Sequence, residues 1–147
     1  MRQLPHLLLF LTIPLFSIAQ TKMTTPLEGA WYLIEGTYNG ETVKPEKPFQ
    51  FKIFTDTHYS FLMQSDEGAW NRGMAGSYKI KDTTYIESCE FSSVPAQIGI
   101  SAEWKYTIED GKLIIEGPIR IMNPDGSDNK EFAGLLNTMH EVRVRAE

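Results

Sequence analysis

Cysteine and histidine are scarce in this 147-residue chain, and their scarcity excludes several kinds of chemistry. Cys89 is the single cysteine, so no disulfide can form within the chain and the core alone has to hold the fold. Beyond the first residues only His58 and His140 remain, and two histidines cannot by themselves complete a zinc site. Nothing marks either of them as a haem ligand. We therefore expect no metal and no other cofactor, and we interpret Cys89, which has no neighbouring histidine to activate it, as a small buried hydrophobe.

The chain also has fewer basic than acidic residues. The chain has 14 Lys and Arg residues against 19 Asp and Glu residues, which gives a net charge of −5. Such a surface attracts neither nucleic acid nor anionic lipid. The sequence also lacks a phosphate-cradling loop, a glycine-flanked nucleophilic serine, an internal repeat and a low-complexity segment. We expect no nucleic-acid partner, and the sequence identifies no protein partner.

No apolar run is long enough to span a membrane. The longest run, residues 7–16, is shorter than the roughly 20 residues that a spanning helix needs. It follows Arg2 and precedes Ser17-Ile18-Ala19, which places small residues three and one positions before Gln20. This is the layout of a signal peptide. We therefore expect a signal peptide over residues 1–19, export to the periplasm or the exterior, and no stable membrane insertion after cleavage.

The remainder of the chain is expected to form one domain. Residues 20–26 are short and polar, and we interpret them as a flexible leader into a domain over residues 27–147. Alternating apolar and polar segments then recur at intervals of roughly 8–12 residues, which is typical of an all-β protein. Tight-turn dipeptides such as Asn39-Gly40 separate them. The predicted strands cover residues 30–38, 49–55, 58–63, 73–80, 83–91, 100–108, 112–117 and 138–146.

These strands favour a closed barrel over an open sheet, because closure removes the two unpaired edges. Most of the connections are hairpins, whereas a two-sheet sandwich usually needs longer crossing connections. We therefore predict an all-β, eight-stranded up-and-down antiparallel barrel in which the first strand pairs with the last. At most one short helix, within residues 130–136, precedes the last strand. Eight strands enclose an interior that side chains can just fill or that can hold one small ligand.

Several short motifs occur in the order found in a known family. They are Gly29-Ala30-Trp31-Tyr32-Leu33, the hairpin around Asp56-Thr57, Gly76-Ser77-Tyr78-Lys79-Ile80, the hairpin around Glu109-Asp110-Gly111, and Glu141-Val142-Arg143-Val144. In this order the chain resembles the lipocalin-like domain family, the small bacterial relatives of the lipocalin and fatty-acid-binding barrels. Within that family it looks most like an uncharacterised secreted branch from Bacteroidetes-type bacteria. The resemblance implies a lipocalin-like up-and-down barrel, often with an apolar ligand.

Trp31 is expected to close one end of the barrel. In a closed barrel the first and last strands pair, so Arg143 or Arg145 can lie over the indole ring as a cation–π contact. The family resemblance favours this arrangement. The alternative is that the indole plugs the narrow end by packing alone. Both interpretations give Trp31, Arg143 and Arg145 a structural role.

The aromatic residues are the best indication of a binding cavity. Alternation places Tyr59 and Phe61 on one face of a strand, and Trp104 and Tyr106 on one face of another. Inward aromatic rings with a few hydroxyl groups are the usual composition of a small-molecule site. The alternative is a packed core whose tyrosine hydroxyls reach water at the barrel mouth. The candidate ligand-binding residues are Tyr59, Phe61, Tyr78, Tyr85, Glu87, Trp104 and Tyr106.

Glu87 is the acid of greatest interest. It shares a strand face with Tyr85 and Phe91, so it points inward if they do. A buried carboxylate has to be paired, hydrogen-bonded or protonated, and it can serve as a general acid or base or anchor an amine. If the strand alternates in the opposite sense, Glu87 faces solvent. The inward residues are then Ile86, Ser88 and Glu90.

The sequence thus favours a secreted, non-enzymatic binding protein for a small apolar or aromatic molecule. One alternative is an enzyme built on the same barrel that transfers a proton through Glu87 and a tyrosine. The other is a protein-interaction domain with a filled core that acts through its rim loops, notably residues 64–72 with Trp70 exposed. The interior distinguishes them, because a cavity of several hundred Å³ favours a ligand and a packed interior favours the interaction domain.

The leader gives the first testable prediction. N-terminal sequencing of the exported protein should begin at Gln20 or its cyclised form, because Ser17-Ile18-Ala19 defines the cleavage site. An intact Met1 on a membrane-embedded product would contradict this interpretation.

Overall fold

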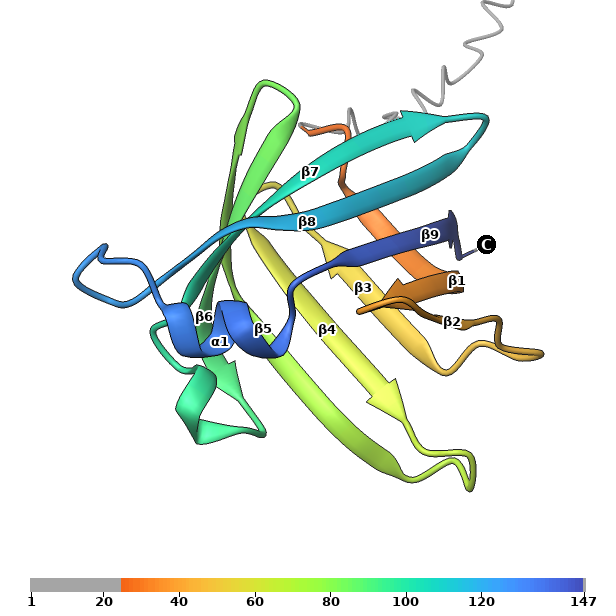
Figure 1. Cartoon of the computed structure of the whole chain (residues 1–147). Coiled ribbons are helices and arrows are strands. Elements are labelled where there is room, and N and C mark those ends of the chain that lie inside the picture. Colours follow the sequence, from red (N-terminus) through yellow and green to blue (C-terminus); the bar gives the residue numbers. More distant parts are fainter. Residues whose placement is uncertain (1–24, 147) are drawn as a thin grey trace, which may run out of the picture.

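The computed structural model describes residues 25–146 and has an all-β fold (Figure 1). The predicted signal peptide lies outside the described residues, so its processing stays a prediction. The strands are β1 (Gly29–Tyr38), β2 (Glu41–Val43), β3 (Gln50–Phe54), β4 (His58–Gln64), β5 (Trp70–Lys81), β6 (Thr84–Ser92), β7 (Ser101–Glu109), β8 (Lys112–Met122) and β9 (Met139–Arg145). The helical segments are η1 (Pro95–Gln97), of 3-10 type, and α1 (Lys130–Leu135). No helix within residues 25–146 is long and apolar enough to cross a membrane.

Eight strands close into a barrel. β1 and β3 to β9 pair antiparallel in chain order, and β1 also pairs with β9, from Trp31 opposite Arg145 to Tyr38 opposite Met139. Figure 1 shows this last strand, in blue, beside the first strand, in orange. The predicted eight-stranded antiparallel barrel with one short helix before the last strand is therefore confirmed.

β2 is an addition to the predicted set of strands. It folds back onto the last three residues of β1 across Asn39-Gly40. Both turn residues have positive φ, 50° for Asn39 and 91° for Gly40, as the tight hairpin turn requires. All residues of β2 are exposed. The segment therefore has no buried apolar face, and alternation could not predict it.

Strand β5 begins earlier than predicted. Trp70 pairs with Gln64 across a short loop, so it belongs to the strand and not to the predicted rim loop of residues 64–72. The loop closes tightly because the Ser65 N–H donates to the Ala69 carbonyl at 2.8 Å. Trp70 is nevertheless 69% exposed, so its side chain lies on the surface as expected.

A β-bulge in β6 reverses the side-chain alternation near the end of that strand. Ala75 and Gly76 are adjacent in β5 but pair with Phe91 and Cys89, so Glu90 has no opposite residue. The extra residue turns Phe91 outward, where it is 70% exposed. Phe91 therefore does not share the inward face of its strand, and that expectation is wrong.

One end of the barrel is closed by a packed cluster around Trp31. The indole is 0% exposed, and its Nε1–H donates to the Leu27 carbonyl at 2.7 Å. The guanidinium of Arg145 lies 4.3 Å from the centre of the indole ring, so Arg145 and not Arg143 makes the cation–π contact. Phe54 and Tyr78 meet edge to face at 5.1 Å within the same cluster. We refer to this as the closed end.

The segment before β1 completes the closed end. Leu27 is fully buried, and the Thr25 hydroxyl is hydrogen-bonded to the Tyr78 hydroxyl at 2.7 Å. The Glu28 carbonyl accepts a hydrogen bond from Arg145 Nη1 at 2.7 Å. The segment that precedes β1 is therefore hydrogen-bonded to the last strand, β9.

Trp31→Ala is expected to destabilise the protein by roughly 3–5 kcal/mol, the range for a large aromatic residue removed from a core. Denaturant unfolding measures the loss. The matched control is Trp70→Ala, whose exposed ring should change stability by less than about 0.5 kcal/mol. A loss below about 1 kcal/mol for Trp31→Ala would mean that the ring does not close the barrel.

Candidate ligand-binding cavity

The opposite end of the barrel contains a cavity of about 790 Å³. Its wall is mostly apolar, and its outer edge is covered by α1 and the residue after it. The principal apolar side chains of the strands are Phe61, Met63, Met74, Trp104 and Met139, and Phe49 lies directly before β3. Those from the helical segment are Phe132, Leu135 and Leu136. This volume lies in the range of known small-molecule sites.

α1 is held over the mouth of the cavity by two asparagines. Asn129 caps the first turn, since its Oδ1 accepts the N–H of Phe132 at 3.0 Å. Asn39 holds the other end, because its Nδ2 donates to the Leu135 carbonyl and its Oδ1 accepts the N–H of Asn137, each at 3.0 Å. Asn39 therefore forms part of the β1–β2 turn and also fixes the position of the C-terminal end of α1.

The candidate residues divide between the two ends of the barrel. Tyr59, Phe61, Trp104 and Glu87 line the cavity. The other three do not, because they lie where their strands approach the closed end and the interior is filled. These three are Tyr78, Tyr85 and Tyr106, of which Tyr85 is fully buried against Phe54 and Tyr106. Contact of any of the seven candidate residues with a ligand stays a prediction.

Glu87 points inward and is paired with a lysine. Its Oε1 lies 2.5 Å from Lys52 Nζ, and both side chains are more than nine-tenths buried. Lys52 also donates to the Tyr85 hydroxyl at 3.3 Å. The ammonium group lies between 5.6 and 5.7 Å from the ring centres of Phe54, Tyr59 and Tyr85, within cation–π range. The lysine charge is thus neutralised by one carboxylate and surrounded by aromatic faces.

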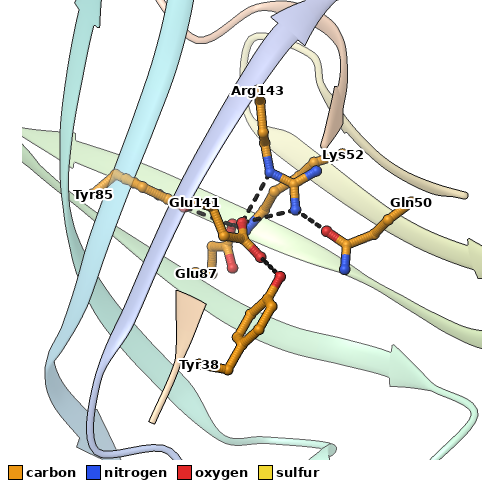
Figure 2. Close-up of polar contacts among 7 residues, drawn as sticks. All are labelled: Tyr38, Gln50, Lys52, Tyr85, Glu87, Glu141 and Arg143. Carbon is orange, nitrogen blue, oxygen red and sulfur yellow. Dashed lines mark hydrogen bonds and ion pairs between the residues drawn. The ribbon is translucent and has the colours of Figure 1, made fainter. Parts of the chain in front are cut away.

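A second buried ion pair lies beside the first. Arg143 donates to Glu141 Oε2 from Nε at 2.9 Å and from Nη2 at 2.8 Å. Its Nη2 also donates to Gln50 Oε1, and the Tyr38 hydroxyl donates to Glu141 Oε1 at 2.7 Å. Figure 2 shows these residues grouped with Lys52 and Glu87 in the barrel interior. We refer to the seven residues drawn there as the polar floor of the cavity; six of them line the cavity, and the seventh, Tyr85, contacts Lys52.

Burial and neighbouring charges shift the pKa values of the floor. Burial alone raises the pKa of Glu141, but the charges of Arg143 and Lys52 and the Tyr38 hydrogen bond outweigh it, so this pKa lies below its ordinary value. Burial, reinforced by Glu141, raises the pKa of Tyr38. Burial, reinforced by Glu87, raises the pKa of Tyr59 and Tyr85. The three phenols therefore remain neutral hydroxyl groups at physiological pH.

Most of the polar floor could not be predicted from the sequence. Gln50 and Lys52 alternate along β3 with Phe51 and Ile53, and alternation alone predicts that the more apolar pair faces inward. The structure inverts that phase: Gln50, Lys52 and Phe54 are buried, while Ile53 is 37% exposed. The signal that could have found the floor is the presence of complementary charges on the inward faces of several strands.

Two further floor and wall donors have no partner within residues 25–146. They are Nε1 of Trp104 and Nη1 of Arg143, both buried. Each can only donate, so a group placed against either has to offer an acceptor. Within the same residues no cluster of three histidine, cysteine or acidic side chains is arranged to hold a metal ion.

The architecture defines a lipocalin-like β-barrel with one filled end and one hollow end. The chain belongs to the family described as domain of unknown function DUF4488, whose model matches residues 26–131. The predicted resemblance to an uncharacterised lipocalin-like branch is confirmed.

Two solved structures show the same fold. A lipocalin-like protein from Bacteroides uniformis is similar with a TM-score of 0.54 and 14% identity, over 82% of this chain and 98% of that chain. An uncharacterised protein from Bacteroides eggerthii gives a TM-score of 0.51 and 17% identity, over 82% and 99%. A comparison with curated proteins finds no match.

Glu141→Gln should lower stability at neutral pH by roughly 3–5 kcal/mol, because Arg143 is left buried without its counter-charge. The pKa of Glu141 is lower in the folded protein than its ordinary value of 4.5, so its stabilising effect is complete above about pH 4.5 and is lost as the pH falls through the folded pKa. The wild type and the variant should therefore converge in acid, as measured by denaturant unfolding at a series of pH values.

The control for this prediction is Glu116→Gln. Glu116 pairs with Lys105 at 3.2 Å on the surface, and such pairs contribute less than about 1 kcal/mol. A constant difference between wild type and Glu141→Gln at every pH would show that the lost stability comes from packing and not from the charge.

Proposed function

We propose that the protein is an exported, non-enzymatic binding protein that holds a small apolar or aromatic molecule. The observation that carries the proposal is the cavity of about 790 Å³, apolar along its walls and polar at its floor. Ligand sites commonly combine an apolar lining with a few fixed polar groups that orient the ligand. Export rests on the leader alone.

The hollow interior supports this function over that of a protein-interaction domain with a filled core. A packed barrel would place Tyr59, Phe61 and Trp104 against one another, whereas here they border open space. Trp70 is exposed, but isolated surface aromatics are common and need no partner.

The polar floor supports binding over proton-transfer catalysis. Glu87 and Tyr85 do converge, as the enzyme alternative requires, but Lys52 contacts both of them. If Glu87 accepted a proton, the Lys52 charge would remain buried without a counter-charge, which is unfavourable. Burial also raises the pKa of Tyr85 well above its ordinary range, which opposes its ionisation.

The direct test is native mass spectrometry of the protein purified from its own source. A molecule retained in the cavity should appear as an added mass that denaturation removes. Protein that carries no added mass and also fails to bind a neutral fluorescent probe would contradict the proposed function.

A neutral fluorescent probe, phenylnaphthylamine, should bind the wild type, and Ala102→Phe should weaken its affinity by about tenfold or more. Ala102 lines the cavity opposite Glu87, so the added ring occupies the space that the probe needs. Fluorescence titration measures both affinities.

The matched control is Ala75→Phe, which makes the same exchange on β5 outside the cavity lining, one residue before the buried Gly76. It should bind the probe as the wild type does. Equal weakening by both variants, or by neither, would show that the probe binds elsewhere.

A further inference from the structure

The charges of the polar floor neutralise one another. Lys52 pairs with Glu87 at 2.5 Å, and Arg143 pairs with Glu141 at 2.8 Å. The floor therefore holds two cations and two anions, all of them buried, and none of the four lacks a counter-charge. This balance restricts what can bind next to it.

We infer that the polar end of the ligand is an uncharged group that both donates and accepts hydrogen bonds, such as a hydroxyl or an amide, and that it lies on the floor with the apolar body directed toward α1. This inference rests on the proposed binding function and specifies the ligand class of the same cavity.

A charged ligand would disturb the balance. A carboxylate would add a third anion beside Glu87 and Glu141, while the charge of each floor cation is already balanced by one carboxylate. An ammonium group would add a third cation beside Lys52 and Arg143. In either case one buried charge would be left without a counter-charge, and burial of an unpaired charge is strongly unfavourable.

Gln50 provides the floor with a hydrogen-bond donor for an uncharged ligand group. Arg143 can only donate, so the Gln50 amide has to turn its oxygen toward Arg143 and its nitrogen away, as Figure 2 shows. That nitrogen carries two N–H groups that can donate to a ligand oxygen. Gln50 itself lines the cavity, so this donor has a fixed direction there.

The floor offers an acceptor at Glu87. An ionised carboxylate has about four acceptor positions, and the Lys52 ammonium accounts for one partner of Glu87. The rest are available to an O–H or N–H group of a ligand in the cavity that Glu87 lines. A hydroxyl or an amide can satisfy both Gln50 and Glu87, whereas a carboxylate cannot donate and an ammonium group cannot accept.

The apolar part of the ligand then has one direction available. Away from the floor the cavity is bordered by Phe61, Met74 and Trp104, and at its outer edge by Phe132 and Leu136. These side chains offer apolar surface, which favours burial of a hydrocarbon or aromatic body.

The experiment compares three compounds with the same alkyl chain: dodecanol, dodecanoate and dodecylammonium. Each compound is titrated against bound phenylnaphthylamine in the wild type at neutral pH. Dodecanol is kept below its solubility limit, and the two charged compounds are kept below the concentration at which they form micelles. We expect dodecanol to compete at a concentration about tenfold or more below that of either charged compound, because only it adds no charge to the floor.

Two variants test the cause. Glu87→Gln leaves the floor with an excess positive charge and should shift the preference toward dodecanoate by about tenfold. Lys52→Met leaves an excess negative charge and should shift it toward dodecylammonium. The control Glu116→Gln, on the surface, should leave the order unchanged.

The outcomes separate the inference from the proposed function. If probe and compounds bind but dodecanoate or dodecylammonium competes as well as dodecanol in the wild type, the inference is wrong and the binding function stands. If neither the probe nor any of the compounds binds, both are wrong. The wild-type comparison decides the inference even where a variant fails to fold.

Discussion

The requirement that buried charges be paired governs the interior of this barrel. Lys52, Glu87, Glu141 and Arg143 come from three strands, β3, β6 and β9, that only the closed sheet brings together. Loss of one of them would leave an opposite charge in the interior, so the four have to be present together. They form a boundary across the barrel: apolar and aromatic packing fills the space on one side, and the cavity occupies the other.

The two ends of the barrel consequently have different physical roles. At the closed end, Trp31 is tied to the entering chain through Leu27 and to the last strand through Arg145, so packing there also fixes the pairing of β1 with β9. At the open end α1, a helix of six residues, lies over the edge of the cavity. Stability is thus concentrated where the interior is filled, and the space for a ligand is kept where the chain is least densely packed.

β-Bulges adjust which residues face the cavity. In β1 the pairing with β9 shifts between Leu33 and Glu35, so the inward face changes from the odd residues around Trp31 to the even ones that include Tyr38. The bulge in β6 has the same effect on Phe91. Without the first of these, the Tyr38 hydroxyl would not reach Glu141, and the polar floor would lose one of its hydrogen bonds.

The sequence by itself determined the all-β class, the eight long strands, the closure between first and last strand and the place of Trp31, because turn residues and two-residue alternation are local signals. It did not determine the phase of β3, where Lys52 and Gln50 face inward although Phe51 and Ile53 are more apolar. Nor did it determine which aromatic residues border the cavity and which pack at the closed end. Those choices depend on bulges, and on charges that become partners only across strands far apart in the chain. The tertiary structure alone decides them, because a lysine is favourable inside a barrel only where its carboxylate is already there.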